Sequence, residues 1–394
     1  MKIFVVGGAG YIGSVCSELL LNEGHEVAIF DNLSEGHRGA VDSRTHFIEG
    51  ELADRQQIEA ALSTHRPDAV MHFAANALVG ESMQNPSKYF RNNICNGLNL
   101  LDAMVAAGVR RIIFSSTCAL FGPPDRLPID ETAQPRPISP YGESKLAFEK
   151  ILRWYDEIHG VKFVCLRYFN ASGATEKFGE DHRPETHLIP AVLQVALGEK
   201  PNVEIYGTDY DTPDGTCIRD YIHILDLANA HILALGEAAS GCYNLGTGGG
   251  SSVREVIESC RKITGRKIET IEKPRRPGDP PRLIASSKRI KKELGWQPQF
   301  QSLDAIVESA WKWHQKFPRG YATKCKPVSE SAVASPLSSG ATVSRVACNV
   351  RCNGAEDCAH YPATFASLTS YSAGRRELLQ PSRFGDPQVS RSAA

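Results

Sequence analysis

Tyr141 and Lys145 are the two residues whose types and spacing most directly suggest chemistry. They stand four positions apart in SPYGESKLAFE, residues 139–149, so on a helix they share one face, one turn apart. Ser139 is a good N-cap and Pro140 suits the first helical position, which predicts a helix that begins there. A phenol beside an ammonium is a candidate proton-transfer pair, because the positive charge is expected to lower the phenol pKa. The alternative interpretation is a solvated helix face without chemistry.

A glycine-rich stretch near the N-terminus could bind the partner that this proton transfer needs. In GGAGYIGS, Gly7, Gly10 and Gly13 follow a strand-like run at residues 2–6 and precede a helical pattern and a second strand that closes on Asp31. Such glycines allow a tight turn and let backbone N–H groups approach a pyrophosphate. Asp31 would accept hydrogen bonds from ribose hydroxyls, which favours NAD over NADP. A phenolate can then take a hydroxyl proton while hydride leaves the same carbon for NAD⁺.

A hydroxyl group is a candidate third member of the site. In FSSTCALFG, residues 114–122, a strand is expected to end near Thr117. The carboxyl ends of parallel strands form the ligand-binding edge of such a sheet, so Thr117 could bond a sugar hydroxyl or Tyr141. A local backbone cap is the alternative for a Ser or Thr at a strand end.

Apolar strand-like runs alternate with helical patterns over the first part of the chain. This alternation predicts an α/β fold with a doubly wound parallel sheet of the Rossmann type, covered on both faces. Beyond residue 170, glycine and proline become frequent, which predicts a smaller mixed α/β domain. The expected strands are 2–6, 27–30, 69–75, 111–116 and 163–168. The expected domains are 1–170 for NAD, 171–321 for the substrate, interleaved with the first, and a low-complexity, disordered tail at 322–394.

Composition excludes several classes of partner. The net charge is -1 at pH 7, which gives no basic field for nucleic acid or an anionic membrane. The longest apolar runs are far shorter than the roughly 20 residues of a membrane span, and the N-terminus does not have the pattern of a signal peptide.

The 11 cysteines are an odd number, and several stand in apolar surroundings. Buried reduced thiols in a cytoplasmic protein are therefore expected.

The tail contains one cysteine-rich stretch, CNVRCNGAEDCAH, with Cys348, Cys352, Cys358 and His360. A metal site there would lack the C-x2-C spacing of structural zinc, so stray cysteines are the favoured interpretation. We expect no metal in this protein.

These motifs together resemble the extended short-chain dehydrogenase/reductase family and, over roughly residues 1–320, its UDP-glucose 4-epimerases. Further segments carry the same resemblance. They include HFAANALVGES, RNNICNG, LRYFNASGA, GEDHRPETHLIP, GTDYDTPDGTCIRDYIH, YNLGTGGGSSV and RRPGDPPRLIASS. The resemblance implies interconversion of UDP-glucose and UDP-galactose in galactose metabolism, with bound NAD and a 4-keto intermediate that turns over in the pocket.

The resemblance also implies a set of site residues. Tyr141, Lys145 and Thr117 would be catalytic. Besides Tyr141 and Lys145, the cofactor would contact Gly7, Gly10, Tyr11, Ile12, Gly13, Asp31, Asn32, Glu51, Leu52, Phe73, Ala74, Ala75, Asn92, Tyr168 and Phe169. Besides Thr117, the UDP-sugar would contact Asn170, His187, Leu188, Glu204, Tyr206, Arg219, Arg276, Asp279 and Leu283.

Three positions depart from the pattern of many family members. Glu51 stands in place of an Asp that binds the adenine amine, Ala77 in place of a Lys near the phosphates, and Thr117 in place of a Ser. Leu283 occupies a position where some members have Tyr and others a smaller residue. We expect it to leave some space for an N-acetyl group on the sugar.

Other activities on the same scaffold are the competing interpretations. A 4-epimerase acting on UDP-xylose/UDP-arabinose or on UDP-GlcNAc/UDP-GalNAc is not separated by sequence. A nucleotide-sugar dehydratase would need acids after Thr117 for its elimination step, and the chain reads TCAL there, which argues against a dehydratase. A nucleotide-sugar decarboxylase on the same scaffold is a related alternative. A non-catalytic dinucleotide sensor is disfavoured because Tyr141 and Lys145 are both present.

The family resemblance implies a homodimer formed through helices packed as a four-helix bundle. The face with Leu146, Phe148, Ile151 and Leu152 is the candidate, and a monomer core would use the same apolar residues equally well.

Overall fold

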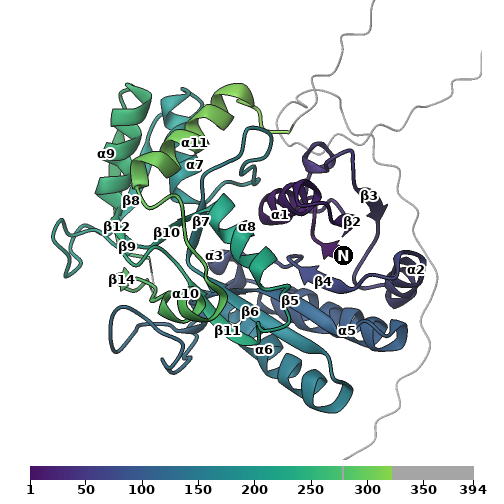
Figure 1. Cartoon of the computed structure of the whole chain (residues 1–394). Coiled ribbons are helices and arrows are strands. Elements are labelled where there is room, and N and C mark those ends of the chain that lie inside the picture. The colour runs from purple at the N-terminus through teal and green to yellow at the C-terminus, as the bar shows by residue number, and fades with distance from the viewer. Residues whose placement is uncertain (277–278, 322–394) are drawn as a thin grey trace, which may run out of the picture. The chain divides into compact units, whose positions relative to one another are not determined.

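A seven-stranded parallel sheet forms the centre of the molecule in the computed structural model, which describes residues 1–276 and 279–321 (Figure 1). The strand order is β11-β6-β5-β4-β1-β2-β3, and each adjacent pair runs parallel. The predicted doubly wound α/β fold is therefore confirmed. The strands are β1 (Lys2–Val6), β2 (Glu26–Asp31), β3 (His46–Glu49), β4 (Ala69–His72), β5 (Arg111–Thr117), β6 (Lys162–Tyr168) and β11 (Gly241–Leu245).

Alternation of side chains along β1 shows how the two faces of the sheet are covered. Ile3 and Val5 pack into one apolar cluster, whereas Phe4 and Val6 pack into another. Both faces are therefore buried, which explains why β1 reads as a continuous apolar run rather than an alternating one.

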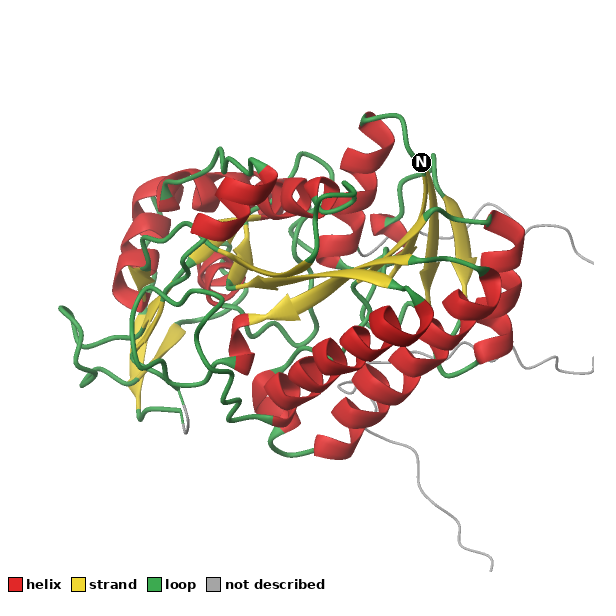
Figure 2. Ribbon diagram, turned by 60° about the horizontal axis from the view of Figure 1, so that its bottom comes forward, coloured by secondary structure: helices red, strands yellow, loops and turns green. Residues whose placement is uncertain are grey.

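Helices cover both faces (Figures 1 and 2). One layer holds α1 (Tyr11–Asn22) and α8 (Ile224–Leu233), which pack against each other. The other layer holds α2 (Arg55–His65), α5 (Asn96–Ala107) and α6 (Pro140–His159). Shorter helices α3 (Val79–Ser82), α4 (Pro86–Phe90) and the π-helical turn η2 (Arg91–Cys95) lead into α5.

Residues beyond 170 form a further hydrophobic core, separate from the two that cover the large sheet. Helices α7 (Leu188–Ala196), α9 (Val253–Thr264) and α11 (Leu303–Lys316) share one core with β8 (Val203–Tyr206), which pairs in parallel with β13 (Thr270–Lys273). The remaining elements are β7 (Asn170–Ser172) with β10 (Tyr221–His223), the sheet of β12 (Ser251–Ser252), β9 (Ile218–Arg219) and β14 (Arg282–Leu283), and α10 (Lys288–Leu294).

Two elements from beyond residue 170 complete the large sheet and the helix layer on one of its faces. β11 pairs with β6, and α8 covers the sheet beside α1. The domain boundary at 170 stays a prediction, and the tail with its cysteines lies outside the described residues. No helix in residues 1–276 or 279–321 combines the length and the apolar composition that crossing a bilayer requires.

Candidate active site

The predicted catalytic and cofactor residues meet at the carboxyl edge of the sheet, where the strand order reverses between β1 and β4. The glycine loop leaves β1, Phe73 to Ala75 leave β4, and Thr117 ends β5. The backbone N–H groups of Phe73 and Ala74 both donate to the Val6 carbonyl, at 2.8 and 3.1 Å. This crevice is the position at which open α/β sheets bind ligands.

The glycine loop fits a bound pyrophosphate. Gly7 has φ of 82°, and a Cβ on it would lie 2.5 Å from the backbone nitrogen of Ala74. A Cβ on Gly13 would collide with the Gly7 carbonyl oxygen. Gly10 is the N-cap of α1 and supplies no side-chain cap, so the first amides of α1 are left for an anion.

We expect Gly13→Ala to destabilise the protein by about 1–3 kcal/mol and to lower its cofactor content at least severalfold, because backbone must move to admit the methyl group. Urea unfolding and acid release of bound nucleotide measure the two effects. Gly80→Ala is the matched control, since its Cβ would meet nothing within 4 Å. Equal stability and cofactor content of the two variants would contradict the assigned role of Gly13.

Asp31 joins this loop to the end of β2. Its carboxylate accepts hydrogen bonds from the backbone N–H groups of Ala9 at 2.9 Å and Leu33 at 2.8 Å. Burial raises the pKa of Asp31, and these two hydrogen bonds oppose the rise. Nearby, Asn32 donates to Glu51 at 3.0 Å, so the two predicted adenosine-side residues lie together. Leu52, which follows Glu51, is buried.

Helix α6 begins as the sequence indicated. The Ser139 hydroxyl accepts from the backbone N–H of Gly142 at 3.1 Å, and Pro140 is the first helical residue. Lys145 is only 2% exposed, and its Nζ donates to the Ser115 carbonyl at 2.8 Å. That carbonyl belongs to β5, so Lys145 fastens α6 to the catalytic edge of the sheet.

The pKa values of the pair differ from the sequence-based expectation. Burial raises the pKa of Tyr141 to about 12, opposed by a hydrogen bond with Thr117. Burial also lowers the pKa of Lys145 to about 7. The expectation that Lys145 would lower the Tyr141 pKa was wrong for the protein by itself, because desolvation outweighs the other contributions to that pKa. A positive charge beyond those of the protein would lower this pKa and so activate the phenol.

Thr117 is a local backbone cap that also lies close to Tyr141. Its hydroxyl oxygen accepts from the backbone N–H of Ala119 at 3.1 Å, which caps the short 3-10 turn η3 (Cys118–Leu120). The same side chain lies near enough to Tyr141 to oppose the rise of the Tyr141 pKa. Residues on neighbouring strands complete this edge: Tyr168, at the end of β6, bonds the Ser115 hydroxyl, and the Phe73 ring lies 4.9 Å from that of His231.

The predicted nucleotide-side residues fall into two groups. Arg219 pairs with Asp279, and Leu283 lies opposite Arg219 in the β9–β14 register. Leu283 also packs on the apolar cluster that contains Cys118, Leu146 and Phe169, next to the catalytic residues. Asn170, the first residue of β7, pairs with Tyr221 in β10.

The second group lies on β8 and the segment after β13. Tyr206 bonds Glu204, and the Arg276 guanidinium lies 4.0 Å from the centre of the Tyr206 ring. His187 and Leu188 stand at the start of α7, where Leu188 packs on the core that includes β8. The His187 side chain faces Glu180 and Glu185.

Residues 3–246 match the model of the NAD dependent epimerase/dehydratase family. The chain belongs to this family. It is 51% identical over 332 residues to the UDP-glucose 4-epimerase of Halalkalibacterium halodurans, an alignment covering 83% of this chain and 99% of that one. The crystal structure of a UDP-glucose 4-epimerase superimposes with a TM-score of 0.80 at 46% identity, covering 82% of this chain and 100% of that one. The Bifidobacterium longum UDP-glucose 4-epimerase in complex with NAD⁺ and UDP gives 0.78 at 38% identity, with coverages of 81% and 100%.

The site of this epimerase/dehydratase family member includes residues that the sequence did not single out. Asn93 is buried; its side chain accepts from the backbone N–H of Asn76 at 2.9 Å and donates to the Ser144 hydroxyl at 3.0 Å. Ser144 in turn donates to the Tyr141 carbonyl at 2.7 Å. Asn93 thus positions the helical turn that carries Tyr141. Its neighbour Asn92 was predicted to bind cofactor, and a run of asparagines in RNNICNG was the available signal.

A buried ion pair supports the same helix. Glu149, one turn after Lys145, accepts from Arg167 Nε at 2.9 Å and from the Ser116 hydroxyl at 2.6 Å. Arg167 and Glu149 are 4% and 1% exposed, so neither charge reaches water. The pair joins α6 to β5 and β6. Removing one partner would leave a buried charge without compensation, so the pair favours this packing of the helix on the two strands.

Proposed function

We propose that this chain is a UDP-glucose 4-epimerase that interconverts UDP-glucose and UDP-galactose with bound NAD. The observation that carries the proposal is the meeting of Tyr141, Lys145 and Thr117 with the glycine loop at one edge of the sheet. The relatives named UDP-glucose 4-epimerase, which align with nearly their full length, support the choice of substrate.

Tyr141 acts as the general base and acid in this proposal. Its phenolate removes the proton of the sugar C4 hydroxyl, and its phenol returns a proton to the C4 oxygen after the sugar has turned over. The Thr117 side chain, which lies close to the phenol, would help to direct it at the reacting oxygen. When bound, NAD supplies the two-electron acceptor and donor of the reaction and brings a positive charge into the site.

The other cofactor contacts follow from the geometry of the glycine loop. The N-terminus of α1 would bind the pyrophosphate and Asp31 the ribose hydroxyls, with Asn32 and Glu51 toward the adenine. Lys145 would face the nicotinamide ribose, because its Nζ is held at the end of β5 by Ser115.

The UDP part of the substrate would be held more firmly than the sugar. Arg219 and Arg276 suit the diphosphate because guanidinium groups match phosphate oxygens, and Asp279 suits the uridine ribose. Glu204, Tyr206, His187, Leu188 and Asn170 would line the remainder of the nucleotide site. Leu283 would set the room available beside the sugar.

Product identification tests the proposed function. The full-length protein would be incubated separately with UDP-galactose, UDP-GalNAc, UDP-arabinose and dTDP-glucose without added NAD, and the sugars released by mild acid would be separated. We expect glucose from UDP-galactose at the highest rate. A 4-keto-6-deoxy product from dTDP-glucose would instead identify a dehydratase, and no product from any sugar would refute the epimerase assignment.

We further propose a cytoplasmic homodimer. The seven cysteines within the described residues are free, and six of them are buried, which suits a reducing compartment. The predicted dimer face is not exposed, because Leu146, Phe148 and Leu152 are buried in the core of the chain itself and Ile151 is partly buried against it. The exposed apolar residues of α6 are Trp154, 60% exposed, and Ile158, 67% exposed, one helical turn apart.

Replacing both Trp154 and Ile158 with glutamate is expected to convert the dimer to a monomer at micromolar concentration, since two charges would be buried in an apolar helix–helix contact. Light scattering during gel filtration measures the mass. Ile271→Glu, at an exposed apolar residue on β13, is the control and should leave the mass unchanged. A dimer that survives the double substitution would exclude this face.

A further inference from the structure

A cluster of four potential metal ligands lies in the segment between β7 and α7. Glu180, His182, Glu185 and His187 each offer one ligand atom, and these four atoms all lie within 4.8 Å of one another. Their spacing, E-x-H-x-x-E-x-H, places all four within one short loop. None of the catalytic steps above uses the side chains of Glu180, His182 or Glu185, and His187, whose ring faces Glu180 and Glu185, would line the nucleotide site through its backbone.

The distances within the cluster suit a tetrahedral ion. From His187 Nδ1 to Glu180 Oε1 and Glu185 Oε1 they are 2.8 and 3.0 Å, and from His182 Nδ1 to Glu180 Oε1 and Glu185 Oε2 they are 3.2 and 3.9 Å. Zinc–nitrogen and zinc–oxygen bonds of about 2.0–2.2 Å give a tetrahedron with edges of about 3.3–3.6 Å. Three of the four distances lie below this edge length and one lies above it, and the four ligand atoms all lie within 4.8 Å of one another, so side-chain rotations would complete the site.

The hydrogen bonding of the cluster is incomplete without a further ligand. His182 Nδ1 is buried and makes no hydrogen bond of acceptable geometry, although a carboxylate oxygen lies 3.2 Å away. A buried ring nitrogen without a partner is uncommon, whereas its lone pair is what a metal ion uses. The carboxylate side chains of Glu180 and Glu185 are only 5% and 3% exposed, so their two negative charges need neutralisation, which either two imidazolium rings or one divalent ion would supply.

We propose that Glu180, His182, Glu185 and His187 bind one divalent transition-metal ion, with zinc as the favoured ion. Two imidazoles and two carboxylates are zinc ligands, and two carboxylates balance its charge. Four protein ligands in one loop form a closed site, so the ion is structural rather than catalytic.

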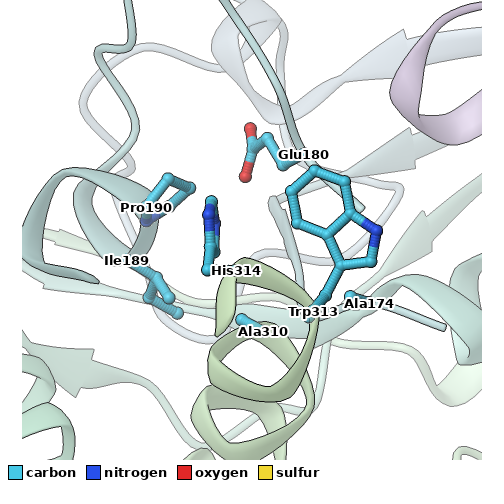
Figure 3. Close-up of a pocket in the computed structure, with 8 residues that line it drawn as sticks. Ala174, Glu180, Ile189, Pro190, Ala310, Trp313 and His314 are labelled. Atoms are coloured by element: carbon cyan, nitrogen blue, oxygen red, sulfur yellow. The ribbon is translucent and has the colours of Figure 1, made fainter. Parts of the chain in front are cut away.

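The surroundings of Glu180 fit this assignment. Figure 3 shows its carboxylate and the His314 ring beside a cavity of about 10 Å³, which has room for roughly one water molecule and no organic ligand. The same loop contacts other parts of the chain. His182 packs edge-on to Tyr11 of the glycine region, and Asp181 accepts from the backbone N–H of Tyr321 at 2.9 Å. A metal ion would therefore fix a loop that lies between the cofactor side and the start of α7.

Metal analysis of the full-length protein tests the site. We expect about one zinc per chain after purification in buffers from which metal ions have been removed. Protein stripped of its metal should take up one Co²⁺ per chain. Co²⁺ should give the visible bands of a tetrahedral site without a thiolate charge-transfer band. His182→Gln and Glu180→Gln should each weaken metal affinity by more than about 100-fold, since even outer-sphere changes cost 10- to 100-fold.

Two controls identify the ligands. His159→Gln removes an exposed histidine at the end of α6 and should retain the metal. Replacing both Cys352 and Cys358 with serine tests the tail as the alternative source of ligands and should also retain it. Stripped wild-type protein that takes up neither Zn²⁺ nor Co²⁺ would overturn the proposal. So would equal uptake by the His182→Gln variant, or a Co²⁺ spectrum with thiolate ligation.

Discussion

Tyr141→Phe is expected to lower kcat about a thousandfold, because the substitution removes the phenol oxygen that is the proposed general base and acid. A positioned general base contributes about 10²–10⁴-fold to a rate, so a thousandfold loss corresponds to about 4 kcal/mol of transition-state stabilisation. The fold and the cofactor content should be retained, since the ring stays and loses one oxygen. Turnover of UDP-galactose and acid-released nucleotide measure these effects.

The pH dependence of this activity provides a second readout. Burial raises the Tyr141 pKa to about 12 in the protein alone and the charge of bound NAD would lower it, so the base form grows as the pH rises toward that lowered value. The wild-type rate should therefore increase with pH, and the residual rate of Tyr141→Phe should not. Tyr155→Phe, on the same helix and bonded to Asp102, is the control. A Tyr141→Phe rate within tenfold of wild type would remove Tyr141 from the mechanism.

Lys145→Met is expected to make the cofactor-free protein more stable at neutral pH while impairing catalysis. The pKa of Lys145 is lowered from 10.5 to about 7 by burial, so between these values the unfolded chain binds one more proton than the folded chain. Stability of the wild type therefore rises with pH over this window. Below pH 7 the full cost of burying the ammonium is present, on the order of 5 kcal/mol at 1.36 kcal/mol per pKa unit.

Urea unfolding of both proteins at several pH values between 6.5 and 9.5, after removal of bound nucleotide, measures this effect. The excess stability of Lys145→Met should be largest at the lowest pH and should shrink as the pH rises. Lys150→Met, at an exposed lysine on the same helix, should show no such pH-dependent difference. An excess that is the same at every pH would mean that folding does not lower the pKa of Lys145.

Features that depend on short stretches of sequence were predictable. Gly7 and Gly13 must approach other backbone atoms, and Ser139 and Pro140 must begin a helix, so local pattern sufficed to place the loop and α6. The strand runs were equally visible, because a parallel sheet buries both faces of its strands and needs continuous apolar residues. β3, with its half-exposed HFIE, gave no such signal.

Features that depend on contacts distant in sequence were not predictable. Glu149 contacts Arg167 and Ser116 only after α6 has packed on β5 and β6, so no local spacing in the sequence predicts that ion pair. Asn93 bonds Ser144 across 51 residues. The same limit explains the Tyr141 pKa, since the degree of burial is a tertiary property. Leu146, Phe148 and Leu152 fit a core and an interface equally well as a pattern, and the structure assigns them to the core.

The late position of β11 and α8 in the chain has a consequence for synthesis on the ribosome. When residues up to 170 have emerged, β6 is an open edge strand, and the half of the sheet that α8 later covers is bare. Exposed strand edges and apolar faces are the surfaces through which incomplete chains aggregate. The nascent chain must therefore pass through a vulnerable stage until Gly241–Leu245 is available to complete the sheet. Chaperones that bind apolar segments would be needed most in this interval.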